Sequence, residues 1–329
     1  HVGGDRTVSI KDGNYICFHN TTNFAGIAVN DGAPAIMGNF IGTNRAGSAL
    51  GNDIGILLGA GADNVTIGTG TYGEGNVIGP SVQAGVWSLA TSGTQAIKGN
   101  YFGTTYDAGT WRDLASAGYG ALINALGATP VIGGVSTGGS GPQSINEGNY
   151  FCYYNGVNEA GVLLWNGQAT VTGNYFGTNR AGDNLRNYTA FGCLGVASGT
   201  FGGTTYGQGN VTASNFYDVW DLSAGGALTI KGNFIGTTYD AGTWRDLGST
   251  SHGIVIENAL NTTTIGGLCT GGVGFVSVYE GNIIGFHDTA LMAGICVVDG
   301  SPTILGNYVG TNRAGTDLGN VYGIQIAAN

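Results

Sequence analysis

The sequence predicts an all-β fold of the solenoid type, a parallel β-helix of about ten coils with three short strands in each coil. Ten of the twelve Gly-Asn dipeptides each open a short apolar run, at positions 13, 38, 75, 99, 148, 173, 209, 232, 281 and 306. The intervals between successive positions are 25, 37, 24, 49, 25, 36, 23, 49 and 25, so short and long intervals alternate. Gly makes up 65 of the 329 residues, about three times its usual share, which favours many tight turns. A repeat in this range of lengths is typical of a solenoid.

Each short interval contains three apolar pieces that predict three strands. The first follows Gly-Asn, as at 14–16, the second has the pattern Gly–apolar–any–apolar, as at 26–29, and the third precedes the next Gly-Asn, as at 35–37. Short apolar runs with a period of two are typical of strands, and the Gly, Asn and Asp residues between them are typical of turns. We expect the Asn of each Gly-Asn to adopt a left-handed turn conformation and the stacked Asn side chains to hydrogen-bond from coil to coil.

The long intervals carry an insertion at one common place, so every second coil has a loop on the same side of the solenoid. The five insertions read TNRAGSALGN at 43, TTYDAGTWRDL at 104, TNRAGDNLRN at 178, TTYDAGTWRDL at 237 and TNRAGTDLGN at 311. The two longest intervals add a second Gly-rich insertion, near 133–147 and 266–280.

A longer period divides the chain into units of four coils. The segment GNYFGTTYDAGTWRDL at position 99 returns as GNFIGTTYDAGTWRDL at position 232. We place two units at about 13–147 and 148–280, followed by a partial third unit at 281–329. Because no linker or change of composition separates the units, we expect residues 1–329 to form one continuous domain.

The repeat motif GN-x-[IF]-G-T-N-x-A-G-x-x-L-G-N, followed by G-I-x-[IL] and T-I-G-G, resembles a known group. It is carried here by residues 38–58 with 66–79, and by residues 306–326. These stretches look like the right-handed parallel β-helix repeats of large secreted proteins of the microbial cell surface. The resemblance covers most of the chain and implies a right-handed β-helix and an extracellular location. It says little about activity: members of the group often lack a known activity, whereas the pectate-lyase-like superfamily, which shares the architecture, includes enzymes, so the fold alone does not decide.

The composition excludes several classes of protein. The net charge is −10, and the ten Lys and Arg residues are scattered, so a surface for nucleic acid is excluded. No apolar run approaches the length of roughly 18 residues that a membrane-spanning helix needs. Residue 1 is His, which fits a secreted chain whose signal peptide has been removed, the alternative being an arbitrary cut.

The sequence contains no convincing catalytic cluster, so we expect no enzyme, no cofactor and no metal. The acidic residues that lie closest together are two copies of one loop: Asp107, Asp113, Asp240 and Asp246. A catalytic centre normally occurs once, so this duplication is better explained by the repeat itself. A Ca²⁺ site made of Asp and Asn oxygens stays open as a weaker alternative, although the nonapeptide pattern G-G-x-G-x-D is absent.

The duplicated insertion carries large aromatic residues that suit sugar stacking or lateral contact with a neighbouring protein. These lateral candidates are Tyr106, Trp111, Tyr239 and Trp244. The other interpretation is that each Trp covers the flank of its own coil. Five sequons, about the number expected by chance, would permit N-glycosylation of an extracellular protein: Asn20, Asn64, Asn187, Asn210 and Asn261.

The two ends of the repeat predict how copies of the chain assemble. The interval from Gly306 to Asn329 is 23, and adding the 13 that leads to Gly13 restores a long interval of 36. An uncapped solenoid exposes strand edges and apolar core at its ends. We therefore expect the N-terminus of one subunit to complete the last coil of the previous subunit, in an open filament that rises roughly 48 Å per subunit. The predicted interface residues are His1, Val2, Gly3, Gly4, Val8, Ile10, Tyr322, Ile324, Ile326 and Asn329.

This junction keeps the alternation of intervals but skips two coils of the four-coil unit. The last coil has a TNRAG loop, and Gly13 resembles Gly148 and Gly281, whereas TNRAG coils within the chain lead to Gly75 and Gly209. The repeat is thus continuous in coil geometry and discontinuous in sequence.

The function we expect is that of a structural subunit of an extracellular filament or surface fibre, with a second copy of itself as partner. Glycans or neighbouring fibres would be further partners. The alternative is a secreted β-helical adhesin, or a protein that binds or degrades a polysaccharide. A third interpretation is a fragment of a longer array of repeats.

Overall fold

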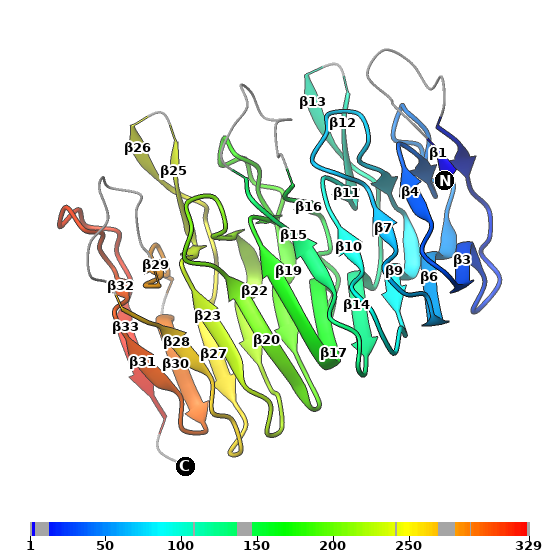
Figure 1. Cartoon of the computed structure of the whole chain (residues 1–329). Helices are drawn as coiled ribbons and strands as arrows, with labels where there is room; N and C mark the ends of the chain where they lie inside the picture. Colours follow the sequence, from blue (N-terminus) through cyan, green and yellow to red (C-terminus); the bar gives the residue numbers. More distant parts are fainter. Residues whose placement is uncertain are drawn as a thin grey trace.

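The computed structural model describes residues 2–3, 13–107, 109–136, 147–240, 242–268, 280–289 and 291–327. This part of the chain contains strands and turns but no helix, and its strands form ten successive coils. The coils lie side by side along one axis, from the N-terminal end at the right of Figure 1 to the C-terminal end at the left. The all-β solenoid predicted from the sequence, a parallel β-helix, is therefore confirmed.

A search of the described residues for a helix that could cross a membrane finds none.

Each coil contributes strands to three parallel ladders, in which a strand pairs with its equivalents in the coils before and after it. The first ladder consists of β2 (Tyr15–Ile16), β5 (Phe40–Ile41), β8 (Val77–Ile78), β11 (Tyr101–Phe102), β16 (Tyr150–Phe151), β18 (Tyr175–Phe176), β21 (Val211–Thr212), β24 (Phe234–Ile235), β29 (Ile283–Ile284) and β32 (Tyr308–Val309). The second ladder consists of β3 (Ala25–Asp31), β6 (Asn52–Gly61), β9 (Ser81–Ser88), β14 (Tyr119–Ala125), β17 (Ala160–Thr172), β19 (Asn187–Cys193), β22 (Ser214–Asp221), β27 (His252–Glu257), β30 (Ala293–Asp299) and β33 (Tyr322–Ile326).

The third ladder follows the corner after the second. It consists of β1 (Val2–Gly3), β4 (Ala35–Met37), β7 (Thr66–Ile67), β10 (Ala96–Ile97), β15 (Val131–Gly133), β17 again, β20 (Ala197–Gly202), β23 (Leu228–Lys231), β28 (Thr264–Gly266) and β31 (Thr303–Leu305). Strand β17 belongs to both ladders because it runs through the corner and pairs with β14 and β15.

Aliphatic and aromatic side chains fill the inside of the coils and stack from one coil to the next. One buried column of the third ladder contains Ile36, Ile67, Ile97, Ile132, Val171, Phe201, Ile230 and Ile265. In the first ladder Phe102, Phe151 and Phe176 stack with ring centroids 4.5 and 5.0 Å apart. Each such side chain stabilises the fold by about 1.5–3 kcal/mol relative to its exposed state. The period-two apolar pattern of the sequence is therefore the pattern of this core.

The Asn residues of the Gly-Asn dipeptides form a hydrogen-bonded ladder along the axis. Each Asn donates from its backbone N and from Nδ2 to Oδ1 of the next Asn; between Asn100 and Asn149 these distances are 2.9 and 3.0 Å. The ladder runs through Asn14, Asn39, Asn76, Asn100, Asn149, Asn174, Asn210, Asn233, Asn282 and Asn307. The contacts between stacked Asn side chains expected from the sequence are confirmed, and they satisfy amides that burial would otherwise make costly.

The left-handed turn conformation, in contrast, does not lie on these Asn residues, so that expectation was wrong. No ladder Asn has a positive φ, whereas the preceding Gly38 has a φ of 68°. At Gly75 the requirement is close approach, because a Cβ there would lie 1.7 Å from the carbonyl oxygen of Gly99. The Gly makes the turn and the Asn is held by the ladder, which explains why both residues recur together.

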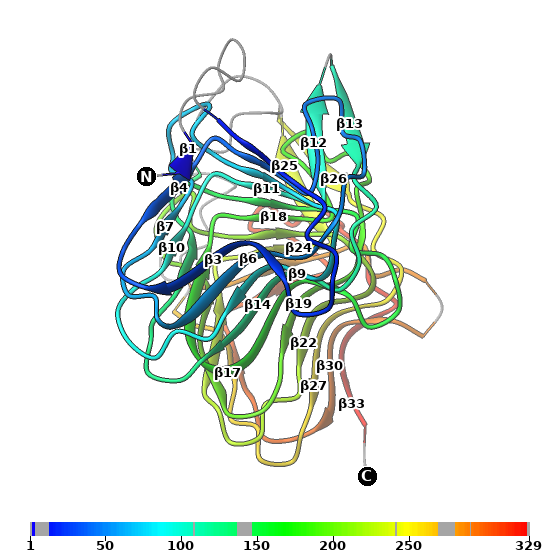
Figure 2. The same cartoon turned by 90° about the vertical axis from the view of Figure 1, so that its right-hand side faces the viewer.

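The insertions lie on alternate coils, as the sequence predicted. In the fourth and eighth coils they are antiparallel hairpins, β12 (Thr104–Asp107) with β13 (Thr110–Asp113) and β25 (Thr237–Asp240) with β26 (Thr243–Asp246). In the second and tenth coils a single antiparallel bridge closes the loop, between Thr43 and Ala49 and between Thr311 and Asp317. Figure 2, viewed from the N-terminal end, shows both hairpins projecting on the same side.

The second insertions, near 133–147 and 266–280, fall largely outside the described residues. The described ladders extend from β1 to β33. The division into four-coil units and the single continuous domain stay predictions.

Candidate functional site

The last coil of the described chain exposes an apolar face. In β33, Tyr322, Ile324 and Ile326 are 42 %, 48 % and 73 % exposed. The equivalents of the last two residues one coil earlier, Ile295 and Val297, are buried. Residues that belong to the core by their position in the strand are therefore open to solvent on this face.

The first coil has a matching face at the opposite end of the molecule. Tyr15, Phe18 and Phe24 are exposed large hydrophobic residues, and Ile16 and Ile27 are only partly buried against the core. Both end coils of the described chain thus present sections of the apolar core.

The three ladders do not end level with one another. Val2 and Gly3 in β1 pair with Ile36 and Met37 in β4, so the third ladder extends one strand beyond β2 and β3 at the N-terminal end. At the C-terminal end the described part of the third ladder stops at β31 in the ninth coil. The first and second ladders continue to β32 and β33 in the tenth coil. The projection at one end corresponds to the gap at the other. The remaining predicted interface residues lie outside the described residues: His1, Gly4, Val8, Ile10 and Asn329.

The Asn ladder has a direction, which makes the two ends chemically unlike. Oδ1 of each Asn accepts from the coil before it, and the backbone N and Nδ2 donate to the coil after it. At the C-terminal end Asn307 accepts from Asn282 and presents its backbone N–H towards the open face. At the N-terminal end, no group of the described residues donates to Oδ1 of Asn14. Donors therefore face outward at one end and an acceptor faces outward at the other.

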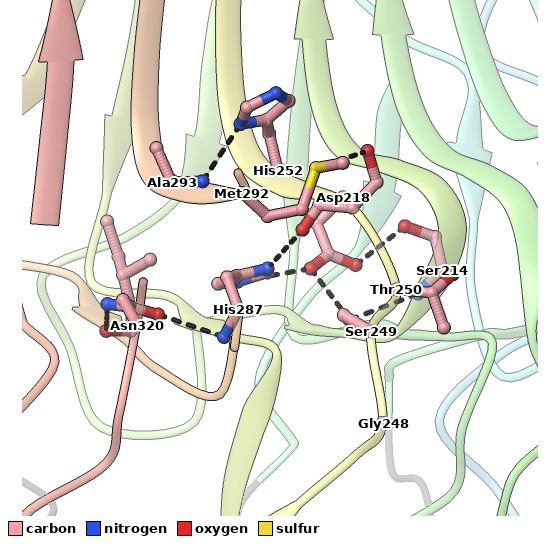
Figure 3. A network of polar contacts seen from close by, with 12 residues as sticks. Ser214, Asp218, Gly248, Ser249, Thr250, His252, His287, Met292, Ala293 and Asn320 are labelled. Atoms are coloured by element: carbon pink, nitrogen blue, oxygen red, sulfur yellow. Dashed lines mark hydrogen bonds and ion pairs between the residues drawn. The ribbon is translucent and has the colours of Figure 1, made fainter. Parts of the chain in front are cut away.

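A buried polar cluster joins three successive coils, as shown in Figure 3. Asp218 on β22 accepts hydrogen bonds from the hydroxyls of Ser214, at 2.8 Å, and Ser249, at 2.9 Å. Nε2 of His287, in the turn after β29, lies 3.6 Å from Oδ2 of Asp218. Both side chains are fully buried, so the pair is part of the internal packing and out of reach of a substrate.

Burial shifts the pKa values of this pair in opposite directions. It raises the pKa of Asp218 to about 7, although the hydrogen bonds from Ser214 and Ser249 lower it. It lowers the pKa of His287 to about 4. Nδ1 of His287 donates to the carbonyl of Ser251 at 2.8 Å, so Nε2 of the neutral ring is the acceptor that faces Asp218. Between those two pKa values the pair contains a neutral imidazole and a protonated carboxyl.

Coils three to five form an equivalent unit, 133 residues earlier in the chain, in which the arrangement is different. Tyr154 takes the position of His287, and its buried hydroxyl lies beside Ser116, the equivalent of Ser249. The position of Asp218 is occupied by Gly85. The longer phenol of one unit thus fills the space that the other unit divides between an imidazole and a carboxyl.

Sequence reasoning missed this cluster, although a signal was present. Asp218 stands at a position of the second ladder that is otherwise occupied by small residues. The column reads Gly26, Gly55, Gly85, Gly120, Gly161, Ala190, Asp218, Gly253, Gly294 and Gly323. A single carboxylate in a column of Gly and Ala indicates a compensating change nearby, which is His287.

The aromatic residues of the hairpins pack against their own coils. Trp111 contacts Tyr106 across the hairpin and Tyr150 on the neighbouring coil, with centroids 5.2 and 4.7 Å apart. Trp244 makes the equivalent contact with Tyr239 at 5.1 Å. All four hairpin residues keep part of their surface exposed. Covering the flank is therefore one of their roles, and lateral contact stays a prediction.

The five sequons fall into two groups. Asn20 and Asn64 are exposed. Asn187, Asn210 and Asn261 are buried, and Asn210 belongs to the Asn ladder. In the folded chain the last three amides are not accessible to modification, so only the first two positions suit a glycan.

Within the described ranges, no group of three or more His, Cys, Asp and Glu side chains is placed to hold a metal ion. The chain matches no protein-family model, and comparison with curated proteins and with solved structures also finds no match.

Proposed function

We propose that the chain is a structural subunit of an extracellular filament or cell-surface fibre that polymerises head to tail. The observation that carries this proposal is the unlike but complementary character of the two end coils. Donors on Asn307 would meet the acceptor on Asn14, and β1 of one copy would occupy the place beside β31 of the previous copy. The contact joins two different surfaces and does not close on itself, so it generates a fibre.

Burial of apolar surface would supply most of the free energy of this contact. Tyr322, Ile324 and Ile326 on one copy would pack against Phe24 and Ile27 on the next. An aliphatic side chain that becomes fully buried contributes about 1.5–3 kcal/mol, so the apolar faces as a whole, and not one residue, would drive assembly.

Electron microscopy of the purified protein tests the proposal directly. We expect fibres in which the axial repeat for ten coils is roughly 48 Å. A monodisperse monomer at micromolar concentration, or an axial repeat far from that value, would contradict it. Intact mass of the native protein is a second check, because additional residues that cover the last coil would also overturn the proposal.

A pair of matched variants separates end contacts from general changes in solubility. Ile324→Asp places a charge on the open face and should raise the critical concentration by about tenfold or more. Leu126→Asp introduces the same charge at an exposed apolar residue in the corner after β14, away from both ends, and should leave assembly unchanged. Equal effects of the two variants would argue against stacking through the end coils.

The alternative function, a secreted adhesin or polysaccharide-binding protein, draws support from a group of aromatic rings on the second ladder. Tyr188 and Phe216 stack at 4.6 Å, and the indole N–H of Trp220 donates to Glu257 at 2.8 Å. Rings that have an apolar face and a polar group beside it suit a partner that offers both kinds of surface, such as a sugar. Binding of the purified protein to a panel of polysaccharides, lost in Trp220→Ala, would favour this function.

A further inference from the structure

A narrow internal space runs along the solenoid beside the small residues of the second ladder. In each of several coils this space is filled by a side chain from the following coil. Nδ2 of Asn52 lies 3.0 Å from a Cβ built on Gly26, and Nδ2 of Asn320 lies 3.0 Å from one built on Gly294. The filling of one coil by the next is therefore a repeated feature of the packing.

The fourth and eighth coils take a ring into this space. In the fourth coil, Tyr154 lies 3.0 Å from a Cβ built on Gly103 and 3.1 Å from one on Gly120. In the eighth coil, Nε2 of His287 lies 2.7 Å from a Cβ on Gly236. Any residue larger than Gly at these positions would displace the ring, so the paired glycines form its binding space.

The tenth coil has the same pair of glycines, and its space is open. A Cβ built on Gly323 would have one heavy atom within 4 Å, Cγ1 of Val309 at 3.8 Å. A Cβ built on Gly310 would meet only Asn320, at 3.5 Å. The described chain has no following coil to place a side chain there.

The residue that occupies the ring position in the first coil is His19. Its local backbone is that of the two ring-bearing coils, because the preceding Phe18 has a φ of 70°, compared with 66° for Tyr153 and 63° for Phe286. The backbone N–H of His19 donates to Oδ1 of Asn52, as that of His287 does to Asn320. The His19 side chain is exposed, and its Nδ1 lies 3.2 Å from Oδ1 of Asn52.

We propose that the His19 imidazole of one copy enters the glycine-lined space of the tenth coil of the preceding copy, and that acidification therefore weakens assembly. This inference rests on the head-to-tail filament proposed above. The enclosed space is formed by glycines, aliphatic side chains and the amide of Asn320, so it accepts a neutral ring. A protonated imidazole carries a charge that such an environment cannot solvate.

Among the described residues, Asp53 lies beside His19: it donates its backbone N–H to the carbonyl of His19, and its carboxylate accepts from the backbone N–H of Asn23. The titratable or charged residues of the tenth coil are Tyr322, Asp317 and Arg313. The variant His19→Tyr separates the contribution of this imidazole from those of the other titratable groups, among them Asp218, whose pKa burial raises to about 7.

The test is the critical concentration for assembly, measured by sedimentation at pH 8 and pH 5. For an imidazole whose pKa falls from the ordinary 6.5 to about 4, as at the enclosed His287, the critical concentration should rise about 30-fold at pH 5. His19→Tyr, which copies Tyr154, should assemble at both pH values with a ratio close to one. His252→Gln, a change at a half-buried His away from the ends, should keep the response of the wild type.

A reciprocal variant tests the other side of the contact. Gly323→Val fills the open space, and the chain should still fold because only Val309 lies nearby. We expect it to lose assembly at both pH values while its unfolding midpoint is kept. Ala224→Val places the same side chain at an exposed turn away from the ends and should assemble normally.

The outcomes separate the two proposals. Fibres whose critical concentration responds to pH equally in the wild type and in His19→Tyr would overturn the role of His19 and leave the filament intact. Normal assembly of Gly323→Val would do the same. Absence of fibres under every condition would overturn both proposals.

Discussion

Two equivalent units of three coils, coils three to five and coils seven to nine, fill the same internal space in two different ways. The first unit uses the phenol of Tyr154, with Gly85 at the position of Asp218, and the second uses the imidazole of His287 beside Asp218. Backbone geometry, buried Ser neighbour and overall volume are shared, while the chemical groups differ. The comparison teaches that the solenoid fixes the space that a column of side chains must fill. A change of side chain on one coil is therefore compensated by a change of side chain two coils away.

The largest expected effect comes from breaking this compensation. His287→Tyr in the presence of Asp218 should lower the free energy of unfolding by about 3–5 kcal/mol, because the phenol and the carboxyl compete for one space. The measurement is chemical unfolding followed by circular dichroism. The double variant His287→Tyr with Asp218→Gly copies the first unit and should recover most of the loss.

The cycle sharpens the comparison through its coupling energy. Asp218→Gly alone removes a buried group and leaves a cavity, so it should also destabilise the chain. If the units are equivalent solutions, the coupling between the two positions should exceed about 1 kcal/mol. Additive costs would show that volume is not the shared constraint.

The pH dependence of stability offers a smaller effect with a defined sign. Burial raises the pKa of Asp218 to about 7, so its contribution is present at low pH and is lost as the pH rises through 7. Burial lowers the pKa of His287 to about 4, so its contribution is lost as the pH falls below the ordinary 6.5 towards 4. Between about pH 4 and 6.5 the two slopes oppose each other, and the wild type should show little change from this pair.

Asp218→Asn removes one of the two opposing contributions. The remaining His287 should then cost about 2 kcal/mol of stability when the pH falls from 7 to 5. Tyr154 does not titrate in this range, so the double variant that copies the first unit serves as the control. If the stability of the wild type fell with acid as steeply as that of Asp218→Asn, the opposing pKa shifts of Asp218 and His287 would be contradicted.

The hairpins provide the smallest difference between the units. Trp111 packs against Tyr106, Tyr101 and Tyr150, whereas the position of Tyr150 is occupied by Ile283 beside Trp244. Trp111→Ala should therefore cost about 1 kcal/mol more than Trp244→Ala, the worth of an additional aromatic pair. Parallel unfolding curves of the two variants would measure it, and equal losses would show that the ring of Tyr150 adds nothing.

The fold could be predicted because its signals repeat. Gly-Asn marks the start of each coil ten times, and the alternation of intervals places the insertions on alternate coils. The apolar runs predict the strands because the core consists of columns of stacked side chains. Each coil contributes one residue to each column. The prediction of the Asn conformation was wrong because Gly and Asn always occur together in the repeat, so the sequence does not show which of them makes the turn. The backbone shows that it is the Gly, as at Gly38.

The candidate site was predicted less completely. The exposed positions of Tyr322 and Ile324 follow from where the last strand falls in its coil. The contact between Asp218 and His287 could not be derived, because their relative register depends on loop lengths that the sequence leaves unassigned. The role proposed for His19 could not be predicted from the sequence, because it depends on the likeness of its backbone to that of His287 and Tyr154.

The direction of the Asn ladder has a consequence for the symmetry of any larger structure. Two C-terminal ends brought face to face would set N–H against N–H at Asn307, and two N-terminal ends would set oxygen against oxygen at Asn14. Neither contact can form hydrogen bonds, so twofold dimers through the ends are disfavoured. A fibre made by parallel addition would have one donor tip and one acceptor tip throughout its growth. The two tips would present different surfaces to the environment, and elongation at each would proceed at its own rate.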